Sequence, residues 1–115
     1  MIAVAGAAFV FVWRAGWPLA RFVVDGASME PTYRAGDRVV VYRWAYRRRG
    51  PAADDVVVLR DPERMGRWIM KRVAFDVGAT SGVYVVGDNA VVSRDSRMFG
   101  EVAGSAIVGR VVMRY

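Results

Sequence analysis

The sequence predicts a small all-β domain, a twisted sheet folded toward a barrel, with a short apolar helix in front of it. Three observations lead to this prediction. Several short segments are rich in β-branched residues and are bounded by Gly, Asp, Pro or Ser, which is typical of strands. No helical period of useful length occurs among these segments. An uninterrupted apolar run occupies the first residues of the chain.

The apolar run extends from Ile2 to Trp13, and its apolar character continues to Val24 despite two interrupting arginines. A membrane-spanning helix needs about 20 apolar residues, and Trp13 and Trp17 suit a membrane interface. We therefore expect residues 1–20 to form a membrane-associated segment. A cleaved signal peptide fits less well, because no basic region precedes the run. The alternative is a helix that docks on the domain itself.

Residues 21–115 are expected to form one β domain. Its strands are short, and the functional residues are expected on the loops that connect them. No internal repeat and no low-complexity segment interrupts this part of the chain. The expected strands are Asp37–Trp44, Asp54–Arg60, Arg67–Phe75, Gly82–Val86 and Ala106–Tyr115.

The composition excludes several kinds of chemistry. The 115 residues include no Cys and no His, and Lys71 is the only lysine beside sixteen arginines. A disulfide framework, a thiol nucleophile, a Cys/His zinc site and a Ser-His-Asp triad are therefore excluded. The net charge of +6 is compatible with nucleic acid, with anionic lipid or with simple solubility.

Lys71 occupies a distinctive position in its expected strand. Alternation places it on the same face as Ile69, Val73 and Phe75, so the lysine lies in an otherwise apolar row. Burial lowers the pKa of a lysine, which lets its amine act as a base near neutral pH. An arginine cannot take this part, because its guanidinium stays protonated. The alternative is a lysine that reaches solvent at the edge of the sheet.

Among the five serines, Ser28 has the most distinctive setting, in Gly26-Ala27-Ser28-Met29-Glu30-Pro31-Thr32. Gly26 permits a close backbone approach, and Pro31 fixes the chain just beyond the serine. The hydroxyl can then be held at an exposed turn beside amides that are free to donate to an oxyanion. Taken alone, the same stretch is compatible with an ordinary turn.

A third distinctive stretch begins with Gly87-Asp88-Asn89, which marks a turn after a strand. Asp95 and Arg97 can pair across the loop that follows and hold its shape. Surface ion pairs contribute little on average, so the pair by itself indicates no function. Ser93 or Ser96 can form a hydrogen bond near a buried amine.

Together and in this order, the three stretches resemble the type I signal peptidases, which are Ser-Lys dyad proteases. The matching stretches are Gly26–Thr32, Lys71-Arg72-Val73 and G-D-N-x-x-x-S-x-D-S-R-x-F-G from Gly87 to Gly100. The resemblance runs from about Asp25 to Gly109. Lys71 and Gly87 are only sixteen positions apart, so the second domain of some members is absent between them, and the chain is similar to a minimal catalytic core.

The resemblance implies Ser28 as the nucleophile and Lys71 as the general base. It also implies that Ser93 forms a hydrogen bond with the lysine, and that Asp95 and Arg97 brace the site. Some members carry a serine donor two residues before the nucleophile, where this chain has Gly26. The implied partner is a precursor polypeptide cut after small residues, with no cofactor, no metal and no nucleic acid.

The substrate and the membrane topology stay open. The compact size and the GRVVMRY ending also resemble maturation proteases of nickel superoxide dismutase, which would act on a cytosolic precursor. A typical signal peptidase has an extracytoplasmic catalytic domain, whereas Arg14 and Arg21 after the apolar run favour a cytoplasmic one. A self-cleaving repressor-type protease fits less well, because no DNA-binding helices precede Ser28.

A hypothesis from another functional class is a non-catalytic basic β module that binds RNA or anionic lipid. The basic cluster Arg43–Arg49, RWAYRRR, is the feature on which that reading depends. The cluster is equally compatible with a solvated loop. Binding that is sensitive to salt and independent of Ser28 would favour this alternative.

Overall fold

The structure is a computed structural model, and it describes residues 2–3, 10–13, 16–76 and 82–115. The described strands form one antiparallel sheet in the order β1-β2-β3-β4-β8-β5-β6-β7. The all-β prediction is confirmed. The strands are β1 (Ile2–Ala3), β2 (Val10–Trp13), β3 (Leu19–Val23), β4 (Arg38–Tyr42), β5 (Val56–Arg60), β6 (Trp68–Val73), β7 (Val85–Val86) and β8 (Ile107–Arg114).

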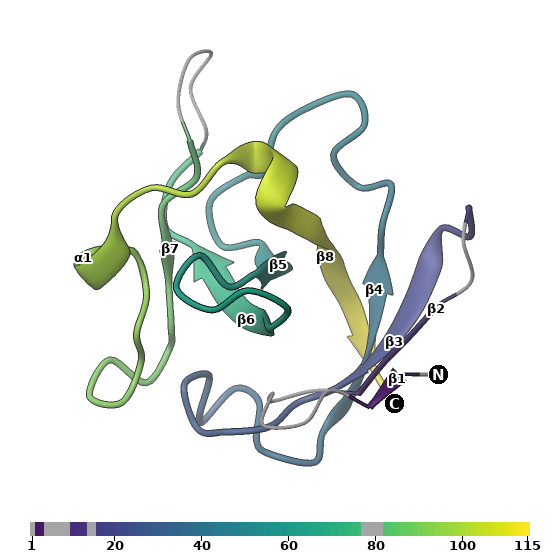
Figure 1. The fold of residues 1–115 in the computed structure, drawn as a ribbon, viewed down its shortest axis with the longest axis horizontal. Coiled ribbons are helices and arrows are strands. Elements are labelled where there is room, and N and C mark those ends of the chain that lie inside the picture. Colours follow the sequence, from purple (N-terminus) through teal and green to yellow (C-terminus); the bar gives the residue numbers. More distant parts are fainter. Residues whose placement is uncertain (1, 4–9, 14–15, 77–81) are drawn as a thin grey trace.

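Each of the five strands expected from the sequence is present; β4, β6 and β8 are shorter at both ends, and β5 and β7 begin later but end where expected. Helical structure in the described residues is confined to α1 (Ser96–Phe99) and to the 3-10 turn η1 (Gly104–Ala106). Strand β8 connects the two halves of the sheet, because it pairs with β4 through Val111 and with β5 through Gly109. The pairing shifts register once on each side of β8, and the sheet curls around a common core (Figure 1).

The core between the two halves is apolar. Alternate residues of β3 and β4 point into it, whereas β5 is buried along four consecutive positions because it lies in the middle of the molecule. Loop residues complete the core, including Met29 and Val102. Its fully buried side chains include Phe22, Val39, Val41, Val57, Val58, Leu59, Val73 and Val85.

The expected helix over residues 1–20 is not found in the described part of that segment. Ile2–Ala3 and Val10–Trp13 are strands instead, and β2 pairs with β3 through Val12 and Arg21. The residues of β2 are β-branched or aromatic, which favours an extended backbone next to a sheet edge that offers hydrogen bonds. Residues 4–9 and 14–15 lie outside the described residues. No helix in the described part of the chain has the length and apolar character to cross a membrane.

Candidate active site

The loop that carries Ser28 connects β3 to β4. The Met29 side chain, only 1% exposed, is buried in the core directly after the serine. The Met29 carbonyl accepts a hydrogen bond from the Tyr33 amide at 2.9 Å, and the Ala27 carbonyl accepts one from Glu30 at 3.1 Å. The buried methionine and these turns fix the backbone on both sides of Ser28, whose own side chain stays partly exposed.

Lys71 lies in the middle of β6 and is 4% exposed. Its neighbours on the same face, Ile69 and Val73, are buried as well, as the alternation predicted. Burial lowers the pKa of Lys71 to about 8, against the attraction of Asp95, which raises it. The repulsion by Arg67 lowers it further. The amine therefore loses its proton near pH 8, whereas an exposed lysine stays protonated at that pH.

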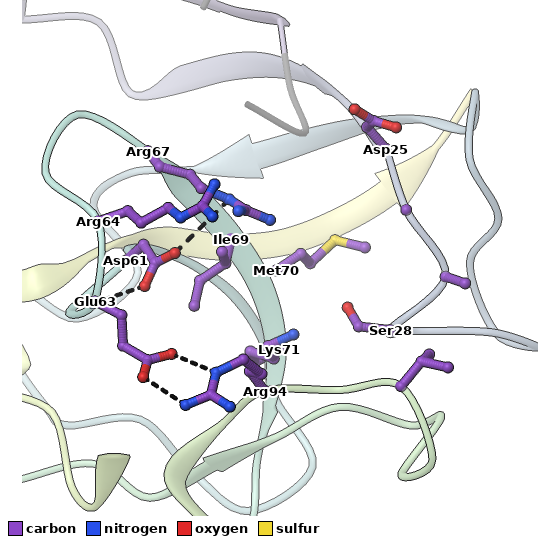
Figure 2. A pocket seen from close by; sticks show the side chains of 13 residues that line it. Asp25, Ser28, Asp61, Glu63, Arg64, Arg67, Ile69, Met70, Lys71 and Arg94 are labelled. Carbon is purple, nitrogen blue, oxygen red and sulfur yellow. Dashed lines mark hydrogen bonds and ion pairs between the residues drawn. The ribbon is translucent and has the colours of Figure 1, made fainter. Parts of the chain in front are cut away.

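Ser28 and Lys71 line the same pocket, which has a volume of about 500 Å³. The Lys71 amine extends toward the Ser28 hydroxyl across this pocket (Figure 2). No hydrogen bond joins the two side chains among the interactions of the described residues. Catalytic hydrogen bonds are often long before a substrate closes the site, so this arrangement is compatible with proton transfer between them.

The backbone amide of Ser28 points to a further function of the loop. Within the described part of the chain this amide donates no hydrogen bond, whereas the Ser28 carbonyl accepts one from the Asn89 amide at 2.8 Å. A free amide beside a hydroxyl is a donor for an oxyanion. Gly26 lines the same pocket with a left-handed φ of 88° and adds no side-chain donor.

The segment Gly87-Asp88-Asn89 holds the serine loop from the other side. The Asn89 side-chain amide donates to the Ala27 carbonyl at 3.1 Å, next to the backbone contact with Ser28. Gly87 packs so closely that a Cβ atom there would lie 2.7 Å from the Ser28 carbonyl and would overlap with Ser93. The segment Gly87-Asp88-Asn89 therefore works as a strap across Ala27 and Ser28.

Asp88 connects this strap to the strand that carries the lysine. Its carboxylate accepts two hydrogen bonds from Arg72, from Nε and Nη2, each at 2.8 Å. It also accepts one from the Thr32 hydroxyl at 2.6 Å. The Arg72 contact lowers the pKa of Asp88, so the carboxylate stays charged. Thr32 and Arg72 were not assigned these contacts from the sequence, since no local pattern shows which carboxylate they meet.

The Asp95 side chain is fully buried and accepts hydrogen bonds from several neighbouring groups. It accepts from the Gly87 amide at 2.8 Å, from the Ser93 hydroxyl at 2.7 Å and from Arg97 at 2.5 Å and 2.9 Å. Burial alone would raise the pKa of Asp95, but these donors, Arg97 first, hold it well below its usual range. Asp95 and Arg97 thus brace the loop.

Two serines of the same loop are also buried, with different partners. The Ser93 hydroxyl donates to Asp95, and no hydrogen bond with Lys71 is present among the described residues. The hydroxyl oxygen of Ser96 accepts from the Val85 amide at 2.8 Å and attaches α1 to β7. The negative charge of Asp95 raises the pKa of Lys71, so this loop influences the lysine through electrostatics.

The far wall of the pocket comes from the β5–β6 hairpin loop, residues 61–67, which the sequence did not point to. Glu63 of this loop pairs with Arg94 through two hydrogen bonds of 2.8 and 2.9 Å, and Arg67 lies 3.7 Å from Asp61 (Figure 2). The pairing of β5 with β6 makes these residues a hairpin turn, and the shared pocket places that turn beside Ser28.

Metal chemistry is not suggested by the side chains around the site. In residues 16–76 and 82–115, no group of three or more acidic side chains is placed to hold a metal ion. The titratable groups that line the pocket are Lys71, the pairs Asp61–Arg67 and Glu63–Arg94, and the single charges Asp25 and Arg64. The buried amine beside a hydroxyl can support general base chemistry.

Comparison with known proteins shows the family to which the chain is related. The family described as "Signal peptidase, peptidase S26" matches residues 1–80 and 76–115. The chain is 33% identical to an Arabidopsis thaliana protein named "Mitochondrial ATP-independent inner membrane protease subunit 1b", with 77% of this chain and 65% of that one aligned. It is 30% identical to "Mitochondrial inner membrane protease subunit 2" of Schizosaccharomyces pombe, with 77% of this chain and 60% of that one aligned. The chain thus spans slightly less than two thirds of these relatives.

Proposed function

Because this chain belongs to the signal peptidase family, peptidase S26, we propose that it is a serine endopeptidase in which Ser28 and Lys71 form the catalytic dyad. The observation that carries the proposal is the shared pocket: a partly exposed serine hydroxyl faces the only lysine of the chain, and that lysine is buried. The low pKa of Lys71, about 8, supports its use as a base.

In the proposed reaction, the neutral Lys71 amine takes the Ser28 proton while the hydroxyl oxygen attacks the carbonyl carbon of the scissile peptide bond. The Ser28 amide donates to the oxyanion that develops there. The Lys71 ammonium then gives its proton to the leaving nitrogen, the peptide bond breaks, and an acyl-enzyme remains. Lys71 next takes a proton from water, whose oxygen attacks the ester carbonyl. The bond from the acyl carbon to the Ser28 oxygen then breaks, Lys71 returns the proton to that oxygen, and the carboxyl product leaves.

The proposed substrate is a precursor polypeptide that presents small residues before the cut. Its N-terminal signal or pro-peptide would enter the pocket beside Ser28, where Gly26 and Ala27 leave room and the hairpin loop 61–67 forms the opposite wall. A cytosolic precursor of nickel superoxide dismutase type is the second candidate substrate. No cofactor takes part in either case.

The proposed organisation keeps residues 1–20 as a membrane-associated segment and residues 21–115 as the catalytic core. The relatives named above are inner-membrane proteases, which supports membrane association of this chain. The side of the membrane follows from the substrate: extracytoplasmic for a signal peptide, and cytoplasmic for a cytosolic precursor.

The test is incubation of the purified chain with precursors and with peptides that contain Ala-x-Ala, followed by mass spectrometry of the products. We expect one cut directly after the small residue, and no product with Ser28→Ala. Ser105→Ala is the matched control, because Ser105 is exposed and lies outside the pocket. Undiminished cleavage by Ser28→Ala would reject the dyad. Absence of cleavage of every precursor would favour the non-catalytic basic module.

A further inference from the structure

The basic cluster noted in the sequence surrounds a second pocket, of about 490 Å³, which the proposed reaction does not use. We call it the basic pocket. It lies between the β4–β5 connection and the beginning of β8, and its lining combines arginines with apolar side chains. The lining residues that matter here are Arg43, Arg47, Arg48 and Arg49 on one side, and Val83, Ile107 and Val108 on the other.

The charged side chains that line the basic pocket are all positive. None of the residues that line it is acidic. The carboxylate of Asp55, which is bonded to the lining residue Tyr46, accepts a hydrogen bond from the Tyr46 hydroxyl at 2.7 Å and another from the Ala52 amide at 3.1 Å. Arg47, Arg48 and Arg49 are exposed. The pocket therefore offers a concentrated positive potential to an anionic group.

The Trp44 ring next to these arginines offers little to a nucleic acid. Base stacking needs an open aromatic face, and the Arg47 guanidinium covers one face of this ring at 4.0 Å from its centre. The opposite wall of the pocket is aliphatic and part of the core boundary. A single anionic head with an apolar continuation fits such a site better than a polynucleotide backbone does.

Exposed apolar side chains lie directly beside the basic pocket. The Arg43 amide donates to the Pro18 carbonyl at 2.6 Å, and the Arg43 guanidinium donates to the Trp17 carbonyl at 2.7 Å. These bonds hold the β2–β3 turn against the β4–β5 connection. Trp17 is 53% exposed and Leu19 is 43% exposed at this junction. Tryptophan next to arginine is typical of the interface of a membrane.

The loop that carries Ser28 leads into β4 and the Arg43–Arg49 connection leaves it, so these two segments lie at opposite ends of the strand (Figure 1). Five residues of strand separate the two ends, a length of about 17 Å. A surface that contacts the arginines and Trp17 would therefore leave the Ser28 pocket open to a polypeptide.

We propose that the basic pocket binds the headgroup of an anionic phospholipid, and that it docks this end of the molecule on a membrane surface together with Trp17. The phosphate lies among Arg47, Arg48 and Arg49, and the glycerol and first acyl carbons lie against the aliphatic wall. Binding at this end needs neither Ser28 nor Lys71, so it can fail or succeed independently of the proteolysis proposed above.

The test is sedimentation of the full chain with vesicles of phosphatidylcholine alone and of phosphatidylcholine mixed with phosphatidylglycerol. The apolar contribution of residues 1–20 appears with both vesicles, so the difference between them isolates the effect of charge. We expect tighter binding to the anionic vesicles. Changing Arg47, Arg48 and Arg49 to Gln should weaken that binding on the order of a hundredfold, about fivefold for each arginine near the surface.

Two matched variants separate the site from total charge and from misfolding. Changing Arg21, Arg34 and Arg38 to Gln removes the same charge from exposed positions elsewhere and should preserve most of the binding. Changing Arg47, Arg48 and Arg49 to Lys keeps the three positive charges and should preserve most of the attraction to the anionic vesicles. Equal losses in the two Gln variants would overturn the proposal.

Soluble ligands distinguish the source of the anion. Glycerol phosphate in solution should bind far more weakly than the vesicles, because it lacks the apolar continuation and the neighbouring lipids. Binding of glycerol phosphate as tight as that of the vesicles would overturn the membrane assignment. So would binding of single-stranded RNA that depends on Arg47–Arg49 in the absence of binding to anionic vesicles.

Discussion

Lys71 differs from every other basic residue of the chain, because its environment makes its proton removable. It is buried between Ile69 and Val73, and burial is the largest influence on its pKa. Asp95 opposes this influence and Arg67 adds to it, so the value of about 8 is a balance between desolvation and nearby charge. An arginine at this position would stay charged and could not accept the Ser28 proton.

The single lysine allows the first prediction to be measured without ambiguity. Protein labelled with ¹³C at the lysine ε carbon should give one side-chain lysine resonance, and we expect it to titrate near pH 8. The rate of cleavage at low substrate concentration should rise through the same pH, because only the neutral amine is a base. Titration near the ordinary value of 10.5 would contradict both expectations.

The second prediction concerns stability. Lys71 has a lower pKa folded than unfolded, so the folded state carries the full cost of the buried charge below pH 8, and stability rises as the pH increases from about 8 to 10.5. Replacing the lysine in Lys71→Met should therefore stabilise the fold by up to about 3 kcal/mol at neutral pH. Urea unfolding of both proteins at pH 7 and pH 10 measures this difference in the free energy of unfolding. A gap between variant and wild type that does not shrink at pH 10 would contradict this origin.

At the scale of elements, the site depends on contacts between the Ser28 loop and the strand of the lysine. Asp88 meets Arg72 of β6 and Thr32 of the loop at the same time. Asn89 meets the carbonyls of Ala27 and Ser28. The strap thus couples the position of β6 to the position of Ser28.

The third prediction follows from this strap. Asp88→Asn should lower the free energy of unfolding by about 1–3 kcal/mol and reduce the turnover number, because the charged contact with Arg72 is lost. Thr32→Val removes only one hydroxyl contact and should mainly reduce turnover. Steady-state kinetics with thermal unfolding tests both. Glu101→Gln is the exposed control, and activity in Asp88→Asn equal to that control would contradict the role of the strap.

Much of the element pattern was available from the sequence, because β-branched residues bounded by turn formers specify a strand locally. The alternation along β6 also predicted the burial of Lys71 among apolar residues. The residues that the loops contact could not be predicted from the sequence, because contacts such as that between Asp88 and Thr32 join residues 56 positions apart. The wall formed by residues 61–67 likewise depends on how the hairpin β5–β6 is placed.

The expected N-terminal helix was wrong in the described residues for a related reason. An apolar run of this length is compatible with a helix or with buried strands, and periodicity alone does not separate the two. The edge of β3 provides hydrogen-bond partners for β2, and the sequence does not reveal that edge. Strand β3 was not among the expected strands, because its residues continue the apolar run that begins at Ile2.

At the scale of the whole molecule, β8 closes the fold by pairing with both β4 and β5. The crossing is tight at Gly109, where a Cβ atom would lie 2.5 Å from the Tyr42 carbonyl and 2.8 Å from the Val41 side chain. The two halves of the sheet, one leading to Ser28 and the other carrying Lys71, therefore depend on a strand that is remote from the reaction.

The fourth prediction tests this closure. Gly109→Ala should destabilise the fold by about 1–3 kcal/mol, because backbone atoms of β4 would have to move. Chemical denaturation followed by tryptophan fluorescence measures the loss. Gly104→Ala is the control, since a Cβ at Gly104 meets no atom within 4 Å. Equal stability of the two variants would show that β8 tolerates a wider crossing.

The central claim, that Lys71 is the base for Ser28, is tested most directly by the cleavage rate of Lys71→Arg on a precursor that the wild-type protein cuts. Arginine keeps the charge and most of the length but does not give up its proton. We predict a loss of about 10²- to 10⁴-fold in rate, with the folded state confirmed by circular dichroism. Cleavage by folded Lys71→Arg at the wild-type rate would contradict the claim.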